Sequence, residues 1–221
     1  MPTLIVTGVG TDVGKTYVTA AIIRAVRERG HPVDALKPVL SGFDYEQPAA
    51  SDAGVLLEAL GQPITAETVE AMAPFRYAAP MSPPLAAARE GKSLSFAEVA
   101  GVCRERMADS GRALLLIEGA GGVMSPLSDG ATVLDLIEAL AVPVLLVTGT
   151  YLGAISHTLT AVEVLRRRGV AIRAVVVSES TEPGASNEET HESLRVLAGG
   201  VPVVSVARGG DVPEELLRLL F

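Results

Sequence analysis

The segment TLIVTGVGTDVGKT (residues 3–16) decides the fold of this 221-residue chain. Residues 3–7 form a short apolar run that predicts a buried strand, and a glycine-rich turn follows over residues 8–14. Residues 15–29 have a helical pattern that a glycine and a proline then end. A strand, a glycine-rich turn and a helix in this order are the setting of a phosphate-binding P-loop.

The chemistry of this loop favours a nucleoside triphosphate. Successive backbone N–H groups and the start of a helix attract phosphate oxygens. Lys15 adds a compact positive charge for the β- and γ-phosphates, and the Thr16 hydroxyl can ligate Mg²⁺. The spacing departs by one residue from the usual pattern, because Gly8 lies one position too far from the Gly-Lys pair and Gly10 one too near. We interpret the segment as a P-loop variant. The alternatives are an ordinary glycine-rich turn and a dinucleotide fingerprint, which would need glycine where Val13 stands.

The rest of the chain alternates between apolar strand patterns and helical patterns. That alternation predicts an α/β fold of the P-loop NTPase type, with a mostly parallel sheet and helices on both faces. Further strands are expected over residues 33–37, 114–117, 142–147, 172–177 and 201–206. Helices are expected over residues 53–60, 96–107, 133–140, 155–168, 187–197 and 212–221. Residues 1–221 are expected to form a single domain, with a proline-punctuated insertion at about 41–92 that carries substrate loops.

Composition and charge exclude several classes of function. Hydrophobic residues make up 48% of the chain and charged residues 20%, which favours a large buried core over disorder. The net charge of −8 argues against nucleic acid as a partner. Apolar runs are too short to span a membrane and no targeting segment is visible, so we expect a cytoplasmic protein. The single cysteine, Cys103, lies in a helical pattern without a neighbouring histidine and is expected to be a buried structural thiol.

Three charged residues follow or precede predicted elements in positions that suit a nucleotide site. Glu118 ends the run LLLIE and precedes Gly-Ala-Gly-Gly, which resembles a Walker B acid; the alternative is an acid that caps the next turn. Lys37 ends the second predicted strand just before a proline, although a solvated lysine is the simpler interpretation. Asp52 starts a helical run after Ser51, and an N-cap is the role that its position alone favours.

Five segments of the chain together resemble the dethiobiotin synthetase family, and they stand in that family's order. The segments are TGVGTDVGKT (7–16), KPVLSG (37–42), PMSPPLAA (80–87), EGAGG (118–122) and YLGAISHT (151–158). The longer glycine-rich turn is a trait of that family. The resemblance implies an ATP- and Mg²⁺-dependent cyclo-ligase that converts 7,8-diaminopelargonic acid and CO2 to dethiobiotin through a carbamate and a carbamic–phosphoric anhydride. It also implies a homodimer that binds the diamine across its interface.

The resemblance assigns roles to individual residues. It implies that Lys15 stabilises the transferred phosphoryl group and that Lys37 bridges the carbamate and the γ-phosphate. The Mg²⁺ ligands that it implies are Thr16, Asp52 and Glu118. The residues expected at the nucleotide are Asp12, Val13, Gly14, Lys15, Thr16, Tyr17, Asp52, Glu118, Gly121 and Ser178. Those expected at the diamine are Ser41, Ser82, Pro83, Gly121 and Gly122, joined by Leu152, Gly153, Ala154 and Ile155 of the second subunit.

Two positions depart from the family pattern. Ser156 stands where the family often has asparagine, and Ser178 stands where an asparagine usually recognises the adenine. A hydroxyl cannot reproduce the paired donor and acceptor of an amide. We therefore predict relaxed discrimination among nucleoside triphosphates.

Two other classes of P-loop protein are alternatives. A P-loop amidoligase that takes nitrogen from glutamine usually carries a glutaminase domain with a catalytic cysteine, for which 221 residues and one cysteine leave little room. An ATPase switch of the partitioning or division-site type would have a further lysine at position 10, where Gly10 stands. The acidic balance also argues against such a switch, because those proteins bind DNA or membranes.

Overall fold

Six parallel strands form the central sheet of the structure, a computed structural model that describes residues 2–221. The strands lie in the order β10-β9-β8-β1-β5-β2, and every neighbouring pair is parallel. Their bounds are β1 (Thr3–Gly8), β2 (Val33–Leu36), β5 (Leu114–Glu118), β8 (Val144–Thr148), β9 (Ile172–Ser178) and β10 (Val203–Val206). The predicted α/β fold with a mostly parallel sheet is confirmed.

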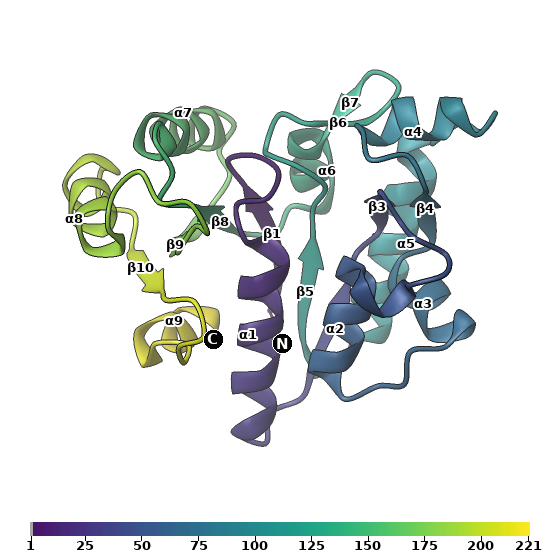
Figure 1. Ribbon diagram of the computed structural model, residues 1–221, viewed down its shortest axis with the longest axis horizontal. Helices are drawn as coiled ribbons and strands as arrows, with labels where there is room; N and C mark the ends of the chain where they lie inside the picture. The colour runs from purple at the N-terminus through teal and green to yellow at the C-terminus, as the bar shows by residue number, and fades with distance from the viewer. Residues whose placement is uncertain (1) are drawn as a thin grey trace.

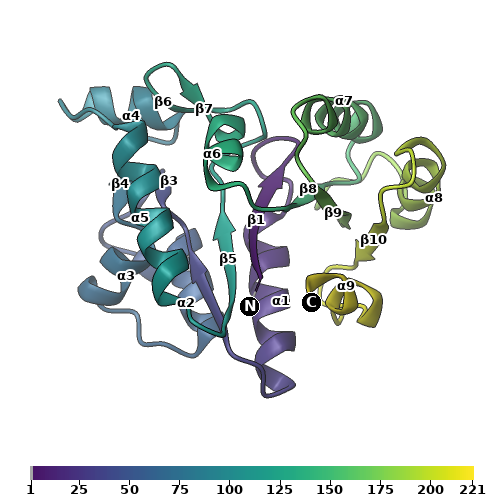
Figure 2. The same ribbon diagram turned by 180° about the vertical axis from the view of Figure 1, so that it is seen from behind.

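Side chains along each strand alternate between two apolar layers, as the period of a strand requires. Leu4 and Val6 belong to one layer, whereas Ile5 between them belongs to the other. The first layer is covered by α1 (Lys15–Glu28), α2 (Asp52–Leu60), α3 (Ala66–Met72) and α9 (Glu214–Leu220). The second is covered by α4 (Pro83–Arg89), α5 (Phe96–Asp109), α6 (Val133–Leu140), α7 (Ala154–Arg167) and α8 (Asn187–Leu197). Figure 1 is seen from the side of α1, and Figure 2 from the side of α5.

Two strands begin later than the sequence pattern predicts. β8 begins at Val144 rather than at residue 142, and β10 begins at Val203 rather than at residue 201. A proline, Pro143 or Pro202, directly precedes each strand. Because proline has no N–H to donate, it ends the hydrogen-bonded ladder at that point. The helices predicted over residues 133–140 and 187–197 have those bounds in the structure.

The segment 41–92, predicted to be an insertion with substrate loops, also contributes to the core. It contains the 3-10 helix η1 (Pro48–Ala50) and the helices α2, α3 and α4. A short parallel pair, β3 (Val39–Ser41) with β4 (Phe75–Tyr77), joins the start of the segment to the strand between α3 and α4. A second short pair, β6 (Pro126–Ser128) with β7 (Ala131–Thr132), is antiparallel and follows β5. None of the helices formed by residues 2–221 has the length and hydrophobicity needed to span a bilayer.

Cys103 lies on α5 with no exposed surface, as expected from the sequence. Burial raises the pKa of its thiol to about 12. Because only the thiolate reacts with alkylating agents, we expect iodoacetamide to modify the native protein at least roughly a thousandfold more slowly than the unfolded chain near neutral pH. Intact-mass time courses with and without guanidinium chloride measure this ratio. Equal rates in both conditions would contradict the buried position.

Candidate active site

The turn between β1 and α1 forms a cradle of backbone N–H groups. Gly14 precedes α1 in the left-handed conformation (φ 91°), and Asp12 also has a positive φ of 56°. A Cβ on Gly14 would lie 2.3 Å from the Oγ of Ser178, so that position has room only for glycine. The first N–H groups of α1 then open onto the turn, where an anion can accept from them.

Lys15 reaches back over this turn from the start of α1. Its ammonium donates to the carbonyl of Gly10 at 2.8 Å, and the residue is only 6% exposed. Burial, followed by the positive charge of Lys37, lowers the Lys15 pKa to about 8. Two lysines that line the same cleft with little exposure to water favour the binding of an anion there.

Lys37 is the centre of a buried charged cluster. Its Nζ lies 2.7 Å from Glu118 Oε1 and 2.9 Å from Asp52 Oδ2, and it also donates to the Gly119 carbonyl at 3.2 Å. The hydroxyl of Thr16 donates to the same Glu118 Oε1 at 2.7 Å. Lys37 is 3% exposed and Glu118 has no exposed surface.

The electrostatics of this cluster keep its groups charged. Burial alone lowers the pKa of Lys37, but the carboxylates of Glu118 and Asp52 raise it by more, so it is held above its usual value. Burial alone raises the pKa of Asp52, and the Lys37 ammonium lowers it by more, so it is held below its usual value. Both groups are therefore ionised near neutral pH.

The sheet order explains why these residues meet. β2 and β5 are neighbours, so their carboxyl ends lie side by side at one edge of the sheet. Glu118 is the last residue of β5. β2 ends at Leu36, one residue earlier than predicted, so Lys37 comes directly after the strand. Lys37 is therefore not the solvated lysine that the simpler interpretation suggested. The contacts of Glu118 go to Thr16 and Lys37 rather than to a turn that it would cap.

The position of Asp52 corrects the N-cap expected from its place in the sequence. Ser51 is the N-cap of α2, because its Oγ accepts from the Gly54 N–H at 3.2 Å. Asp52 is the first residue of the helix, and its carboxylate is free to pair with Lys37. The N-cap prediction for Asp52 was wrong because Ser51 and Asp52 are adjacent and both residue types cap helices. The Ser51 hydroxyl also donates to the Pro48 carbonyl, which holds Ser51 at the N-cap position.

The oxygen atoms around Lys37 suit a hard divalent cation. Glu118 Oε2 is buried and has no hydrogen-bond partner in the structure, and Thr16 and Asp52 supply further oxygens beside it. Mg²⁺ binds through one or two carboxylates and keeps waters and phosphate oxygens as its other ligands. Within residues 2–221 no group of three or more histidine, cysteine or acidic side chains is placed to hold a metal ion. A metal ion at this site would therefore need waters or phosphate oxygens as further ligands. These donors therefore fit Mg²⁺ that arrives with a nucleotide.

A cleft of about 820 Å³ connects the P-loop with the charged cluster. The predicted site residues that line it are Asp12, Gly14, Lys15, Thr16, Tyr17, Lys37, Ser41, Asp52, Ser82, Pro83 and Gly121. Other lining residues that the sequence did not single out include Ser125, Thr181 and Arg208. Ser125 holds the glycine loop after β5, since its Oγ accepts from the Gly122 N–H at 2.7 Å. Ser125 was missed because a serine three residues after a glycine is only a weak turn signal. Arg208 was missed because no local sequence pattern predicts that it lies near Tyr17.

Several predicted residues lie outside the lining of this cleft. Val13 and Glu118 are buried, and Gly122 packs so closely on the P-loop that a Cβ would lie 3.1 Å from the Gly10 nitrogen. Ser178 is 2% exposed and packs on Gly14. The residues predicted to act from a second subunit, Leu152, Gly153, Ala154 and Ile155, lie at the start of α7.

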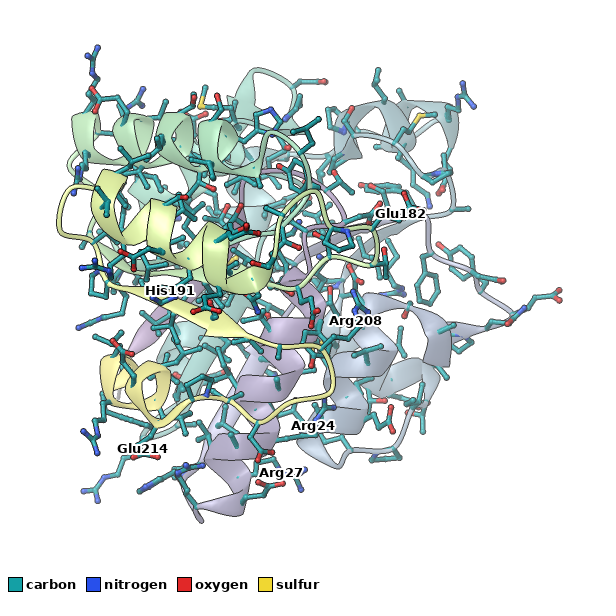
Figure 3. The ribbon with its side chains drawn as sticks, turned by 60° about the vertical axis from the view of Figure 1, so that its left-hand side comes forward. Arg24, Arg27, Glu182, His191, Arg208 and Glu214 are labelled. Carbon is teal, nitrogen blue, oxygen red and sulfur yellow. The ribbon has the colours of Figure 1, made fainter. Side chains whose placement is uncertain are left out.

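One end of the cleft, here called the base end, is built by Tyr17, Thr181 and the segment after β10 that carries Arg208. The Tyr17 hydroxyl donates to the Ala207 carbonyl at 2.9 Å and accepts from the Gly209 N–H at 2.7 Å. The Arg208 guanidinium lies 5.8 Å from the centre of the Tyr17 ring, and its backbone N–H donates to Glu179 at 3.0 Å. Figure 3 shows Arg208 on this segment, beside the loop that carries Glu182.

A glycine-rich turn before a helix, a buried lysine over it and an acid at the end of the neighbouring strand define a P-loop nucleotide-binding protein.

Comparisons with known proteins specify the family. Residues 2–213 match the family model described as an AAA domain. The chain is 53% identical over 225 residues to the ATP-dependent dethiobiotin synthetase BioD of Methylobacterium nodulans, which covers 100% of this chain and 99% of that protein. It is 51% identical to the enzyme of the same name from Phenylobacterium zucineum, with 93% of this chain and 88% of that one covered. The chain belongs to the ATP-dependent dethiobiotin synthetase family.

Solved structures confirm the fold class independently. The signal recognition particle 54 kDa protein of Aeropyrum pernix K1, solved in complex with GDP, superposes with a TM-score of 0.51 at 16% sequence identity. The superposition covers 99% of this chain and 46% of that one, and it shows the fold alone. The family relationship confirms the resemblance found in the motifs, and it favours neither the ATPase switch nor the amidoligase.

Proposed function

We propose that this chain catalyses the ATP-dependent formation of dethiobiotin in biotin biosynthesis, from 7,8-diaminopelargonate and CO2, with release of ADP and phosphate. Family membership supports the proposal, and so does the placing of Lys15 and Lys37 in a single cleft. A cytoplasmic location belongs to the proposal, because the reaction consumes ATP.

The proposed chemistry needs positioned positive charge more than a covalent catalyst. One amine adds to CO2 and loses a proton, giving a carbamate. A carbamate oxygen attacks the γ-phosphorus and displaces ADP, and the second amine then attacks the carbamate carbon and expels phosphate as the urea ring closes. The carbamate and the γ-phosphate are both anions, so they repel each other as they approach. Lys37 between them and Lys15 over the phosphates offset that repulsion, in a place where water cannot screen it.

Thr16, Asp52 and Glu118 are the residues that we propose hold Mg²⁺ with the nucleotide. The unpartnered Glu118 Oε2 and the Thr16 hydroxyl beside the P-loop support this set. The bound cation would supply charge neutralisation of the β- and γ-phosphates. Glu118 has a second task in this chain, because it also keeps the buried Lys37 ammonium charged and in place.

The diamine end of the cleft is proposed to lie along Ser41, Ser82, Pro83 and the glycine loop 121–122. The hydroxyl of Ser41 is buried and has no partner in the structure, which leaves it available for an amine or a carbamate oxygen. Ser41 is held at the end of the short strand β3, and Gly42 turns the chain away after it with a φ of 75°. A buried polar group without a partner is costly unless a ligand satisfies it.

The start of α7 is proposed to meet the substrate carboxylate of the other subunit in a homodimer. Leu152 is 91% exposed, which is unusual for a large apolar side chain. Gly153 is the N-cap of α7 and provides no side-chain cap. The Ala154 N–H donates to the Tyr151 carbonyl at 3.0 Å, so the next N–H groups, those of Ile155 and Ser156, are the ones left for a ligand. Such a helix start attracts a carboxylate.

A product assay tests the proposed function. The protein is incubated with ATP, Mg²⁺, bicarbonate and the diamine, and mass spectrometry follows dethiobiotin while a coupled assay follows ADP. We expect dethiobiotin and ADP in equal amounts, with no ADP release when the diamine is left out. Robust ATP hydrolysis that is indifferent to the diamine would contradict the proposal and favour an ATPase switch.

Relaxed nucleotide selectivity follows from the base end of the cleft, at Thr181 and Arg208, which we assign to the nucleotide base. Ser178 packs on Gly14 instead of facing the cleft, and the exposed Thr181 and Arg208 offer donors that many bases accept. A site that rejects an analogue strongly needs buried polar groups that the analogue leaves unpaired. We expect kcat/KM for ATP, GTP and CTP to fall within about tenfold of one another, which corresponds to roughly 1.4 kcal/mol. Initial rates under one set of conditions measure this, and a strict preference for ATP would refute it.

A further inference from the structure

A reciprocal pair of hydrogen bonds fastens residues 179–185, here called the β9–α8 loop, to the turn after β8. The N–H of Thr150 donates to Ser180 Oγ at 2.9 Å, and the N–H of Ser180 donates to Thr150 Oγ1 at 3.1 Å. The carbonyl of Thr150 accepts from Gly184 at 2.7 Å and from Ala185 at 3.1 Å. Thr150 is 1% exposed. Its N–H, its hydroxyl oxygen and its carbonyl therefore all bind this one loop.

The two ends of the β9–α8 loop reach different parts of the site. Near its start, Thr181 lines the nucleotide cleft together with Arg208. Near its other end, Gly184 lies so close to Leu152 that a Cβ on the glycine would be 2.5 Å from the Leu152 nitrogen. Figure 3 shows the loop by its labelled residue Glu182, with Arg208 below it in the view. The loop thus spans from the base end of the cleft to the start of α7.

The geometry points to Thr150 as a positioning residue that couples the nucleotide end of the cleft to the start of α7. Nucleotide contact at Thr181 restricts the motion of the β9–α8 loop. The hydrogen bonds between that loop and Thr150 then restrict the motion of the backbone at Leu152. The coupling needs no large movement. A segment that the first ligand has already ordered loses less conformational entropy when the second ligand binds, so the second ligand binds more tightly. The identity of the two ligands rests on the proposed function, whereas the coupling itself rests on the hydrogen bonds.

The surroundings of Thr150 distinguish it from Thr190, another buried threonine. The hydroxyl of Thr190 donates to the Ser186 carbonyl within one end of α8, at 2.9 Å. Such a bond stabilises its own helix and joins nothing else. Thr150 and Ser180 are thirty residues apart and belong to two separate connections. A Cβ on Gly149 would lie 2.5 Å from Ser180 Oγ, so the backbone before Thr150 is shaped to admit the serine.

Hydrogen exchange read by mass spectrometry tests the coupling in the full-length protein. The variants are Thr150→Val, which removes the acceptor for Ser180, and Thr150→Ser, which keeps it. Thr190→Val is the matched control, because it also removes one hydroxyl from a buried threonine. In the unaltered protein we expect ATP with Mg²⁺ and without diamine to slow exchange both at residues 180–185 and at residues 151–155.

Loss of the Thr150 hydroxyl should separate the two responses. In Thr150→Val we expect ATP to leave exchange at residues 151–155 unchanged, and we expect KM for the diamine to rise about tenfold while kcat changes less than about twofold. Thr150→Ser should restore both. Thr190→Val should lower the melting temperature without either effect.

Three results would overturn the inference. These are protection of residues 151–155 by ATP in Thr150→Val, the same losses in Thr190→Val, or a rise in KM for ATP with the diamine KM unchanged. If the unaltered protein makes no dethiobiotin, the proposed function fails, and the exchange experiment with ATP still decides whether Thr150 couples the two segments.

Discussion

The Lys37→Ala variant should lose at least about a thousandfold in kcat, on the order of 4 kcal/mol of transition-state stabilisation, while it still binds nucleotide. The ammonium is the positive charge of the cluster, with Nζ 2.7 Å from Glu118 Oε1 and 2.9 Å from Asp52 Oδ2. Without it, a carbamate and a γ-phosphate would meet in a buried place that two acids already make negative. Nucleotide binding persists because the P-loop backbone and Lys15 remain.

Turnover and binding must be measured separately to test this. Dethiobiotin formation at saturating substrates gives kcat, and titration with a non-hydrolysable ATP analogue gives Kd. Lys92→Ala is a suitable control, because Lys92 also pairs with a glutamate at 2.7 Å but is 54% exposed, and it should leave both values unchanged. A Lys37→Ala enzyme with more than about a tenth of normal kcat would remove Lys37 from the proposed chemistry.

The Glu118→Gln variant should be both inactive and markedly less stable. Lys37 would keep its buried ammonium but would lose the partner that is itself fully buried, and Asp52, whose side chain is 38% exposed, compensates less. Breaking a buried ion pair by removing one partner costs roughly 3–5 kcal/mol. For a chain of this size that corresponds to a fall in Tm of about 10 °C. Thermal unfolding measured by circular dichroism is the test.

The exposed pair Glu90–Lys92 provides the matched comparison for that result. Its nitrogen–oxygen distance is 2.7 Å, the same as that of Lys37–Glu118, but its side chains are 23% and 54% exposed. Glu90 also accepts from the Ala78 N–H at 2.7 Å, a bond that the amide oxygen of a glutamine can keep. Glu90→Gln should therefore change Tm by no more than about 2–4 °C. A Glu118→Gln protein as stable as Glu90→Gln would show that the buried cluster contributes nothing to folding.

The pH dependence of this contribution has a definite sign. The Asp52 pKa is lowered on folding, so its stabilising contribution is present above the unfolded pKa and is lost as the pH falls through the folded value. The Lys37 pKa is raised, so its contribution is present below its unfolded pKa and is lost as the pH rises through the folded value. The cluster therefore stabilises the fold fully over the neutral range, and the difference between Glu118→Gln and the unaltered protein should be flat there.

Local patterns predicted the parts of the fold that local chemistry controls. The P-loop, with Lys15 and Thr16 at the start of α1, follows from the glycines and the flanking strand, and the limits of α6 and α8 follow from their apolar periodicity. Glu118 was recognised because a strand-ending acid beside a P-loop has a known use. Lys37 and Asp52 needed the family resemblance, because their meeting depends on β2 lying beside β5 and on Ser51 taking the cap.

The parts that escaped prediction depend on side chains from distant segments. Ser178 packs on Gly14, and Arg208 reaches Tyr17, only because β9 and β10 complete the sheet on the far side of β8. The pairing of Thr150 with Ser180 has the same origin. No periodicity encodes such contacts, since they join loops whose sequences contain ordinary polar residues.

The buried thiol on α5 makes the protein convenient for spectroscopy. Cys103 is the only cysteine in the chain and has no exposed surface, so it should stay silent towards maleimide dyes and spin labels. A cysteine introduced at the exposed Glu182 would then carry a single probe on the loop between β9 and α8, without any need to remove native thiols. Fluorescence from that probe would report in real time when the loop responds to a nucleotide.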